Sequence, residues 1–255
     1  MKTVGVWTLK GGVGKTAAAV NLSYVAARLG RRTLLWDMDP QGAASFYLRV
    51  APRLKGGVDT VVKRSRQLAH HVKATEFDNL SLLPADFSYR HLDLELNGRK
   101  RATRRLADKV APLDGRFDLV MLDCPPSVSL VSEAMLRAAD AILVPVIPST
   151  LSMRTLDQVR GFVADVGGKR PPMILPFLSM LDRRKRLHLE TADRCLADPE
   201  FLRTAIPSAS IVERMGVVRA PVAATLPTQP AARAFEALWS EVSDRIGLTP
   251  MSSGG

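Results

Sequence analysis

The amino-acid sequence predicts one α/β domain, built on a mostly parallel sheet that helices cover on both faces. Three observations support this fold class. Short apolar runs alternate with longer stretches of helical periodicity. A glycine-rich loop joins the first apolar run to the first helical stretch. Two later apolar runs end in aspartate, and the carboxyl ends of parallel strands are where α/β sheets bind their ligands. Strands that alternate with helices imply a parallel sheet buried on both faces.

The expected elements follow from local periodicity. The strands are short apolar runs, and they cover residues 4–8, 33–36, 80–83, 119–122, 141–146 and 173–178. The helices have apolar residues spaced three and four apart, and they cover residues 15–29, 88–110, 129–138, 152–166, 185–197 and 231–246. Gly30 closes the first helix. The last helix carries an apolar stripe of Phe235, Leu238, Trp239, Val242 and Ile246.

Length and composition favour a single globular domain. The chain has 255 residues, of which 46% are hydrophobic and 24% charged, so bulk disorder is excluded. We expect the domain to span residues 1–248 and the short polar tail 249–255 to be disordered. The sequence has no apolar run of about 18 residues, which a transmembrane helix would need. The first residues lead into a glycine-rich loop rather than a signal peptide, so a cytoplasmic location is expected.

The charge points to a class of partner. The 36 basic and 25 acidic residues give a net charge of +11. Such an excess favours a polyanion, either nucleic acid or an anionic membrane surface. A charge that serves solubility alone is the alternative, and charge by itself does not separate the two.

Residues 10–16 read Lys-Gly-Gly-Val-Gly-Lys-Thr, between an expected strand and an expected helix. This is the context of a phosphate-binding loop, in which glycines let backbone N–H groups approach the anion at a helix N-terminus. Lys15 is expected to reach the β- and γ-phosphates of ATP, and the Thr16 hydroxyl to coordinate Mg²⁺. The residues expected at the nucleotide are Gly11, Gly12, Val13, Gly14, Lys15, Thr16 and Ala17.

The loop departs from the ordinary pattern, because Leu9 stands where the standard loop has glycine and Lys10 adds a second lysine. In this it resembles the deviant Walker A ATPases, the family of ParA, MinD and the nitrogenase iron protein. The resemblance implies that Lys10 reaches across a homodimer to the partner's nucleotide. A side chain that binds only the assembled dimer would couple dimerisation to bound ATP.

Two further motifs extend the resemblance. The second expected strand is followed by Asp37-Met38-Asp39-Pro40-Gln41-Gly42, whose last four residues match a signature of the family. The resemblance implies that Asp39 positions or activates the attacking water and that Asp37 supports the site. An apolar strand ends at Asp123, before Cys124-Pro125-Pro126-Ser127, as in a Walker B motif. Asp123 is then expected to bind Mg²⁺ with Thr16, partly through water.

Other positions depart from the family pattern. Ile206-Pro207 followed by Glu213-Arg214 looks like a degraded form of a family segment in which the proline lies near the adenine. Pro207 is therefore expected beside the base, although Ser208 replaces an arginine there. Ala17 replaces a frequent second threonine. Neither change touches the phosphate loop lysines or the aspartates, so slow ATP hydrolysis to ADP and phosphate, suited to a switch, is expected.

The residues discriminate among three other branches of the family. The two cysteines, Cys124 and Cys195, exclude a disulfide framework and a four-ligand zinc site, and their spacing does not suit a cluster-bearing reductase. A MinD-like membrane-surface ATPase that positions division or polar machinery is the alternative, but the stripe of the last helix is better suited to docking on the core. A metabolic ligase would not need the positive charge.

The ParA branch explains the charge, because its members bind DNA without sequence preference as ATP-bound dimers. Two basic clusters are candidates for contacts with double-stranded DNA. The first is Arg99, Lys100, Arg101, Arg104 and Arg105, and the second, which is favoured, is Arg183, Arg184, Lys185 and Arg186. With no helix-turn-helix expected before the first strand, operator binding is not expected. The resemblance implies a nucleoid location, a role in chromosome, plasmid or cargo partitioning, and a ParB-like or adaptor partner that stimulates hydrolysis.

Overall fold

The computed structural model describes residues 1–57, 60, 65–96, 106, 110–168 and 170–248. It contains a seven-stranded sheet in the order β3-β4-β2-β5-β1-β6-β7. Neighbouring strands run parallel except for β3, which is antiparallel to β4. The strands are β1 (Lys2–Val6), β2 (Thr33–Asp37), β3 (Lys73–Ala74), β4 (Leu80–Leu83), β5 (Leu119–Asp123), β6 (Ala141–Val146) and β7 (Met173–Leu178).

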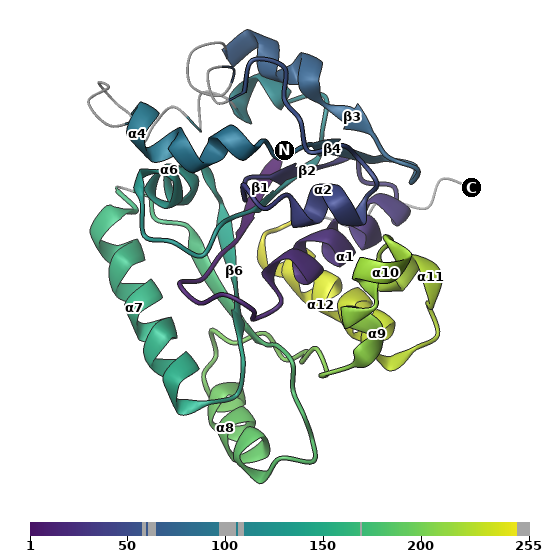
Figure 1. Ribbon diagram of the computed structural model, residues 1–255. Helices are drawn as coiled ribbons and strands as arrows, with labels where there is room; N and C mark the ends of the chain where they lie inside the picture. The colour runs from purple at the N-terminus through teal and green to yellow at the C-terminus, as the bar shows by residue number, and fades with distance from the viewer. Residues whose placement is uncertain (58–59, 61–64, 97–105, 107–109, 169, 249–255) are drawn as a thin grey trace.

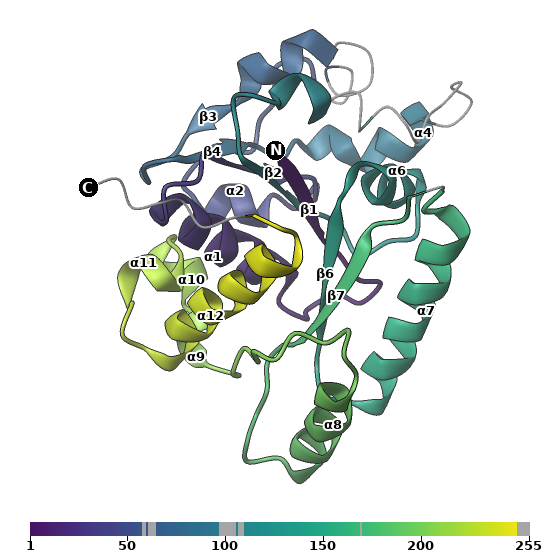
Figure 2. The same ribbon diagram turned by 180° about the vertical axis from the view of Figure 1, so that it is seen from behind.

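Helices cover both faces of the sheet, as the sequence predicts (Figures 1 and 2). The α-helices are α1 (Lys15–Arg28), α2 (Ala43–Tyr47), α4 (Leu92–Leu96), α6 (Leu130–Ala138), α7 (Thr150–Val166), α8 (Arg186–Ala197), α9 (Ser210–Glu213), α10 (Met215–Val218), α11 (Val222–Thr225) and α12 (Pro230–Arg245). Short 3-10 helices cover Ser65–His71, Phe87–His91 and Ala111–Leu113.

The strands divide the core into two apolar layers. Successive side chains of a strand point to opposite faces of the sheet. Trp36 and Leu122 belong to the layer beneath α6 and α7, whereas Leu35 and Met121 belong to the layer beneath α1 and α12. The inner strands β2, β5, β1 and β6 are therefore buried on both sides, which explains their almost continuous apolar sequences. The same alternation puts the last residues of β2 and β5 on the α1 side.

The C-terminal helix docks on the core. The five residues of its expected stripe are each at most 5% exposed, and they pack in the layer that contains α1. Arg28 of α1 also pairs with Glu236 at 2.7 Å. The prediction that this stripe serves docking is thus confirmed. In the described part of the chain, none of the helices is long and apolar enough to cross a membrane.

Apart from the helix over 88–110, the expected strands and longer helices occur, and each of their ends either coincides with the expected residue or differs from it by one or two residues. The first strand is shifted by two residues at both ends, because its ladder starts at Lys2 and stops before Trp7. The expected helix over 88–110 is only partly described: its start forms a 3-10 turn followed by α4. Residues 99–105, which include the first basic cluster, and the tail 249–255 lie outside the described residues. Local periodicity did not predict α2, β3 or the short helices α9 to α11.

Candidate nucleotide-binding site

The glycine-rich loop leaves β1 and enters α1 through a left-handed turn. Gly12 has a φ of 69° and Gly14 a φ of 90°, and Gly14 is the N-cap of α1. A side chain at Gly14 would also meet the Ser179 hydroxyl, because a Cβ there would lie 2.9 Å from its Oγ. That hydroxyl donates a hydrogen bond to the Val13 carbonyl at 2.8 Å. The segment after β7 therefore braces the loop, and glycine is required at position 14 for both backbone and packing reasons.

Lys15 is held inside this loop. Its side chain is buried, and its ammonium group donates a hydrogen bond to the Lys10 carbonyl at 3.1 Å. Burial lowers the pKa of Lys15, and the nearby carboxylates of Asp123 and Asp39 partly offset this. The lysine is thus turned back over the loop, where a bound phosphate chain would meet it. Lys10 is half-buried, and Gly11 and Gly12 are exposed.

Two aspartates end neighbouring strands in register. Asp37 of β2 and Asp123 of β5 are directly paired across the ladder. Both are buried, and burial raises the pKa of Asp37 to about 6 and raises the pKa of Asp123 well above its usual range. Proximity to Asp37 is the second cause of the raised pKa of Asp123, because two like charges at this corner repel each other.

The buried oxygens of these aspartates fit a divalent cation. Neither oxygen of Asp123 has a hydrogen-bond partner of normal geometry among the described residues, and the same holds for Oδ1 of Asp37. The Thr16 hydroxyl is close enough to lower the pKa of Asp123, although burial outweighs it. Oxygen ligands are what Mg²⁺ prefers, and it is commonly held by one or two carboxylates together with substrate phosphates. Thr16 and Asp123 are therefore the residues that would hold the metal.

Asp39 begins the turn that leads to α2. Its Oδ1 accepts a hydrogen bond from the backbone N–H of Gln41 at 2.9 Å, and its carbonyl accepts one from Gly42 at 2.9 Å. Its charge acts on Lys15, Asp37 and Asp123, so the side chain lies within the same cluster. It is only half-buried, which leaves it accessible to water.

A pocket of about 180 Å³ opens beside the phosphate loop. Gly12, Gly14 and Ala17 form one wall, and Pro207 and Ser208 lie on the other. The segment that carries Pro207 lies beside the residues that follow β7, because Leu181 and Pro207 form a parallel bridge. Pro207 is therefore next to the loop, as a contact with the base of a nucleotide would require.

The favoured basic cluster lies between β7 and the start of α8, whose first residue is Arg186. All four of its residues are exposed, and none lines the pocket beside the phosphate loop. Arg184 forms a two-pronged ion pair with Asp182, at 2.9 and 3.0 Å, and lowers the pKa of Asp182 to about 2. Arg186 pairs with Glu190 at 2.7 Å. The segment projects with α8 from the end of the sheet where β7 finishes (Figures 1 and 2).

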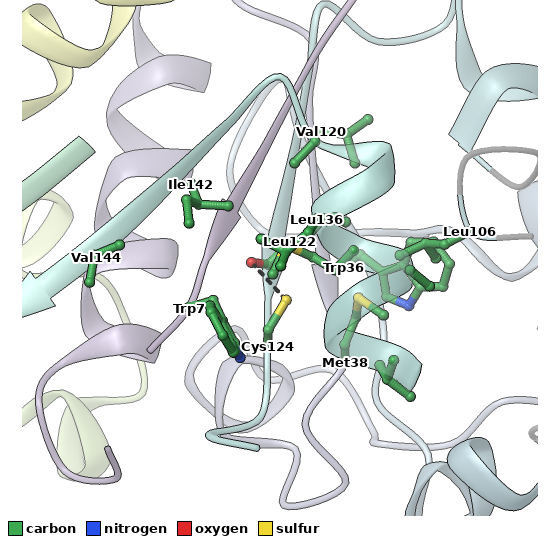
Figure 3. Packing of buried hydrophobic residues seen from close by; sticks show 14 of the residues in the cluster. Trp7, Trp36, Met38, Leu106, Val120, Leu122, Cys124, Leu136, Ile142 and Val144 are labelled. Atoms are coloured by element: carbon green, nitrogen blue, oxygen red, sulfur yellow. Dashed lines mark hydrogen bonds between the residues drawn. The ribbon is translucent and has the colours of Figure 1, made fainter. Parts of the chain in front are cut away.

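Cys124 packs against the sheet, as its place after an apolar strand predicts. It is 1% exposed and lies among Trp7, Trp36 and Met38 (Figure 3). Burial raises the pKa of its thiol well above the usual range, so the reactive thiolate is disfavoured. Its sulfur contacts the Leu122 carbonyl at 3.7 Å.

Sequence reasoning missed two serines that support the site. Ser179 braces the phosphate loop, and Ser45 of α2 donates hydrogen bonds to Asp37 from its backbone N–H at 2.8 Å and its hydroxyl at 2.7 Å. Ser179 is remote in sequence from the carbonyl that it contacts, so no local pattern predicts this contact. Ser45 follows the Asp39 signature closely, which is the one signal in the sequence that would have singled it out.

Comparisons with known proteins agree with this geometry. A family model described as "AAA domain" matches residues 1–172. The chromosome-partitioning ATPase Soj of Thermus thermophilus is 33% identical over 256 residues, which cover 96% of this chain and 97% of that protein. The chain belongs to the ParA/MinD family of P-loop ATPases. The chromosome partitioning protein ParA of Myxococcus xanthus is 35% identical over 151 residues. These residues cover 59% of this chain and 53% of that relative, so the match spans about half of the relative's length.

Solved structures of the same fold contain nucleotide and magnesium. Cobyrinic acid a,c-diamide synthase from Mycobacterium smegmatis, with a bound ATP analog and magnesium, has a TM-score of 0.79 and 25% sequence identity. The match covers 100% of both chains. An ATP analog and magnesium are therefore ligands of a structural relative of this ParA/MinD-family chain.

Proposed function

We propose that this chain is a partitioning ATPase that switches between nucleotide states. In the proposed cycle it binds ATP and Mg²⁺, forms a sandwich homodimer through Lys10, and binds double-stranded DNA without sequence preference. A ParB-like or adaptor partner then stimulates slow hydrolysis to ADP and phosphate, and the dimer releases DNA. The convergence of Lys15, Thr16, Asp39 and Asp123 at one phosphate loop, with Lys10 on the same loop, carries the proposal.

The role that we propose for each residue follows from its position at the phosphate loop. Backbone N–H groups from Gly11 to Thr16 and the Lys15 ammonium group would bind the phosphates, with Ala17 and Pro207 flanking the nucleoside. Thr16 and Asp123 would hold Mg²⁺, which neutralises charge on the phosphates when bound. Asp39, the accessible carboxylate of the cluster, would orient the attacking water. Lys10 would neutralise the partner's phosphates.

The proposed DNA contact rests on the exposed cluster of Arg183, Arg184, Lys185 and Arg186, and on the net charge of +11. Surface lysines and arginines neutralise phosphates and release counterions, which gives a sequence-independent and salt-sensitive affinity. Dimerisation would bring two clusters to one DNA segment and so raise the apparent affinity. This mode of action would put the protein in the cytoplasm, on the nucleoid.

The test measures binding to random-sequence duplex DNA with ATP, with ADP and without nucleotide, across a salt series. We expect retention with ATP only, and a steep loss as salt rises. Arg183→Glu combined with Lys185→Glu should abolish this retention, because these two exposed residues are not the ones that pair with Asp182 and Glu190. The matched control is Arg116→Glu with Arg170→Glu, which changes the charge equally just before β5 and β7, at the opposite end of the strands. Equal binding in all three nucleotide states would contradict the switch.

A second candidate, an ATP-dependent ligase, is favoured by one observation: a structural relative is a cobyrinic acid a,c-diamide synthase. A ligase would use the same phosphate loop and metal corner. It would hydrolyse ATP only with an acid or amine substrate and would bind DNA weakly in every nucleotide state. The DNA experiment therefore separates the two candidates.

A further inference from the structure

Ser45 connects three parts of the molecule. It is fully buried in α2, and it donates two hydrogen bonds to Oδ2 of Asp37, from its backbone N–H at 2.8 Å and its hydroxyl at 2.7 Å. Its hydroxyl oxygen also accepts a hydrogen bond from the backbone N–H of Ala85 at 3.0 Å. This hydroxyl thus donates and accepts at once, and its rotation is fixed by its two partners.

The consequence for Asp37 is an asymmetric carboxylate. Oδ2 is engaged by two donors, whereas Oδ1 is buried and has no hydrogen-bond partner of normal geometry among the described residues, although the backbone N–H of Asp39 is near enough to lower the pKa of the carboxyl group. Asp37 is in register with Asp123, whose two oxygens are likewise without partners of normal geometry in the described part of the chain. Buried acceptors without partners are costly, so a group of them in a native site indicates that the site binds a ligand. Here the three acceptors, Oδ1 of Asp37 and both carboxylate oxygens of Asp123, lie near the Thr16 hydroxyl, and we call this place the magnesium corner.

The helix that carries Ser45 is itself held in place. Arg219 donates a hydrogen bond to the Phe46 carbonyl at 3.0 Å, and Arg49 donates to the Val218 carbonyl at 3.0 Å. These bonds fix the C-terminal end of α2 against α10. Ser45 therefore belongs to a rigid support and not to a free loop, which is what alignment of a ligand group requires.

We propose that Ser45 is a positioning residue, which occupies one oxygen of Asp37 so that the other faces the magnesium corner of Thr16 and Asp123. Asp37 then acts in the outer shell of the metal, beside the residues that would hold it directly. Groups of this kind orient the ligands and change metal affinity when they are removed. The inference rests on the proposed function, because it assumes that magnesium and nucleotide bind at this corner.

The test compares Ser45→Ala with Ser23→Ala. Ser23 is also a fully buried serine, but it lies in α1 and its hydroxyl has no hydrogen-bond partner among the described residues. The melting temperature is measured at a fixed saturating ADP concentration while Mg²⁺ is titrated. We expect the half-saturating Mg²⁺ concentration to rise about tenfold in Ser45→Ala and to stay at the wild-type value in Ser23→Ala. Affinity for a fluorescent ADP analogue in EDTA should change less than about twofold in both variants.

A double variant tests whether Ser45 acts through Asp37. Asp37→Asn should also raise the half-saturating Mg²⁺ concentration, and adding Ser45→Ala should raise it no further, because without a charged oxygen at position 37 the serine has no metal-directed group to position. Ser45→Cys keeps a similar volume with a weaker donor, so it should give an intermediate shift and serves if Ser45→Ala unfolds.

Different results would overturn the role of Ser45 and the proposed function. A Ser45→Ala protein that is less stable without ligands but keeps the wild-type Mg²⁺ dependence would show that the serine only joins β2 to the turn after β4, and would overturn the proposal. Additive effects in the double variant would overturn it as well. A wild-type protein that ADP and Mg²⁺ do not stabilise would overturn the proposed function, and this inference with it.

Discussion

At Gly14 both the backbone conformation and the surroundings exclude a side chain. Its φ of 90° is strained for any other residue, and a Cβ would lie 2.9 Å from Ser179 Oγ. We expect Gly14→Ala to lower the free energy of unfolding by about 1–3 kcal/mol. It should also weaken ATP binding, because the loop N–H groups would move. Thermal unfolding and nucleotide titration measure the two effects.

The control for this substitution is Gly161→Ala in α7. A Cβ added at Gly161 would meet no heavy atom within 4 Å among the described residues, and this glycine lies inside a helix without a positive φ. Alanine there should raise stability by about 0.5–1 kcal/mol and leave ATP binding unchanged. Equal stability of the Gly14→Ala and wild-type proteins would mean that the loop relaxes freely, which would contradict the bracing role of Ser179.

Asp37 gives the ligand-free protein a defined pH dependence. Burial raises its pKa from 3.8 to about 6, so between these values the folded state binds a proton that the unfolded state has lost. The free energy of unfolding therefore falls as pH rises from about 4 to about 6, and the full cost remains at neutral pH. A shift of this size corresponds to at most about 3 kcal/mol.

Asp37→Asn should remove this dependence, because the amide oxygen can still accept from Ser45 but carries no charge. Relative to wild type, we expect little change in stability near pH 4 and a gain of about 1–3 kcal/mol at pH 7, both without nucleotide or magnesium. Denaturant unfolding at several pH values checks this. A variant that is less stable than wild type at pH 7 would show that the ionised carboxylate is stabilised by its surroundings, contrary to the inferred direction.

For single residues, the sequence predicts what lies within a motif and misses what folding brings to it. Lys15, Asp39 and Asp123 are predicted from local patterns, and the structure brings them into one cluster. Ser179 reaches Val13 across 166 positions of sequence. No local pattern encodes such a contact, because it depends on the packing of β7 beside the loop.

Among the elements, α2 and α10 are joined by two arginines, each of which follows one helix and bonds to the end of the other. Each follows one of these short helices in a left-handed conformation, with a φ of 56° at both Arg49 and Arg219. Each guanidinium group donates to carbonyls at the end of the other helix, as Arg49 does to Val218 and Arg219 to Phe46. Arg219 also lies over the Phe46 ring, 4.5 Å from its centroid. A cation at a helix C-terminus interacts favourably with the unpaired carbonyls and the dipole.

A double-mutant cycle measures how strongly Arg49 and Arg219 depend on each other in stabilising the contact between α2 and α10. We expect Arg49→Ala and Arg219→Ala each to cost about 0.5–1.5 kcal/mol, with a coupling of about 0.5–1 kcal/mol between them. The control pair is Arg186→Ala with Glu190→Ala, an exposed pair on α8 whose coupling should be no more than about 0.5 kcal/mol. Strictly additive effects of the two arginine substitutions would show that the two arginines act independently, and single substitutions without any cost would show that the helices are held by packing alone.

The same short helices explain where prediction of the elements failed. Helices such as α1, α7 and α12 span several turns, so their apolar spacing is visible in the sequence. Helices of four or five residues, such as α2 and α9 to α11, show too little periodicity and are stable only through tertiary contacts. Apolar runs alone predict that the second and fourth strands end just before Asp37 and Asp123. In the structure both aspartates are the last residues of their strands, because their backbones pair with each other regardless of the polar side chains.

For the whole molecule, the decisive question is whether two copies assemble on ATP. The phosphate loop, the pocket and the exposed basic segment all lie beyond the carboxyl ends of the parallel strands, so one edge of the sheet carries these candidate groups together. Lys10 is half-buried there, and its carbonyl holds Lys15. Because the carbonyl and not the ammonium group of Lys10 makes this bond, its side chain can serve a second copy in the proposed dimer.

Lys10→Ala in an Asp39→Ala background tests this assembly. Asp39→Ala alone should bind ATP, fail to hydrolyse it and accumulate as a dimer of twice 27.8 kDa, as measured by light scattering. Adding Lys10→Ala should return the protein to the monomer mass while fluorescent-ATP binding stays within about threefold, because a phosphate contact made only in the dimer is lost. Lys15→Ala is the contrasting variant and should abolish ATP binding itself. If the double variant still dimerises with ATP, Lys10 does not reach the partner; if Asp39→Ala stays monomeric, Asp39 does not serve hydrolysis in the proposed way.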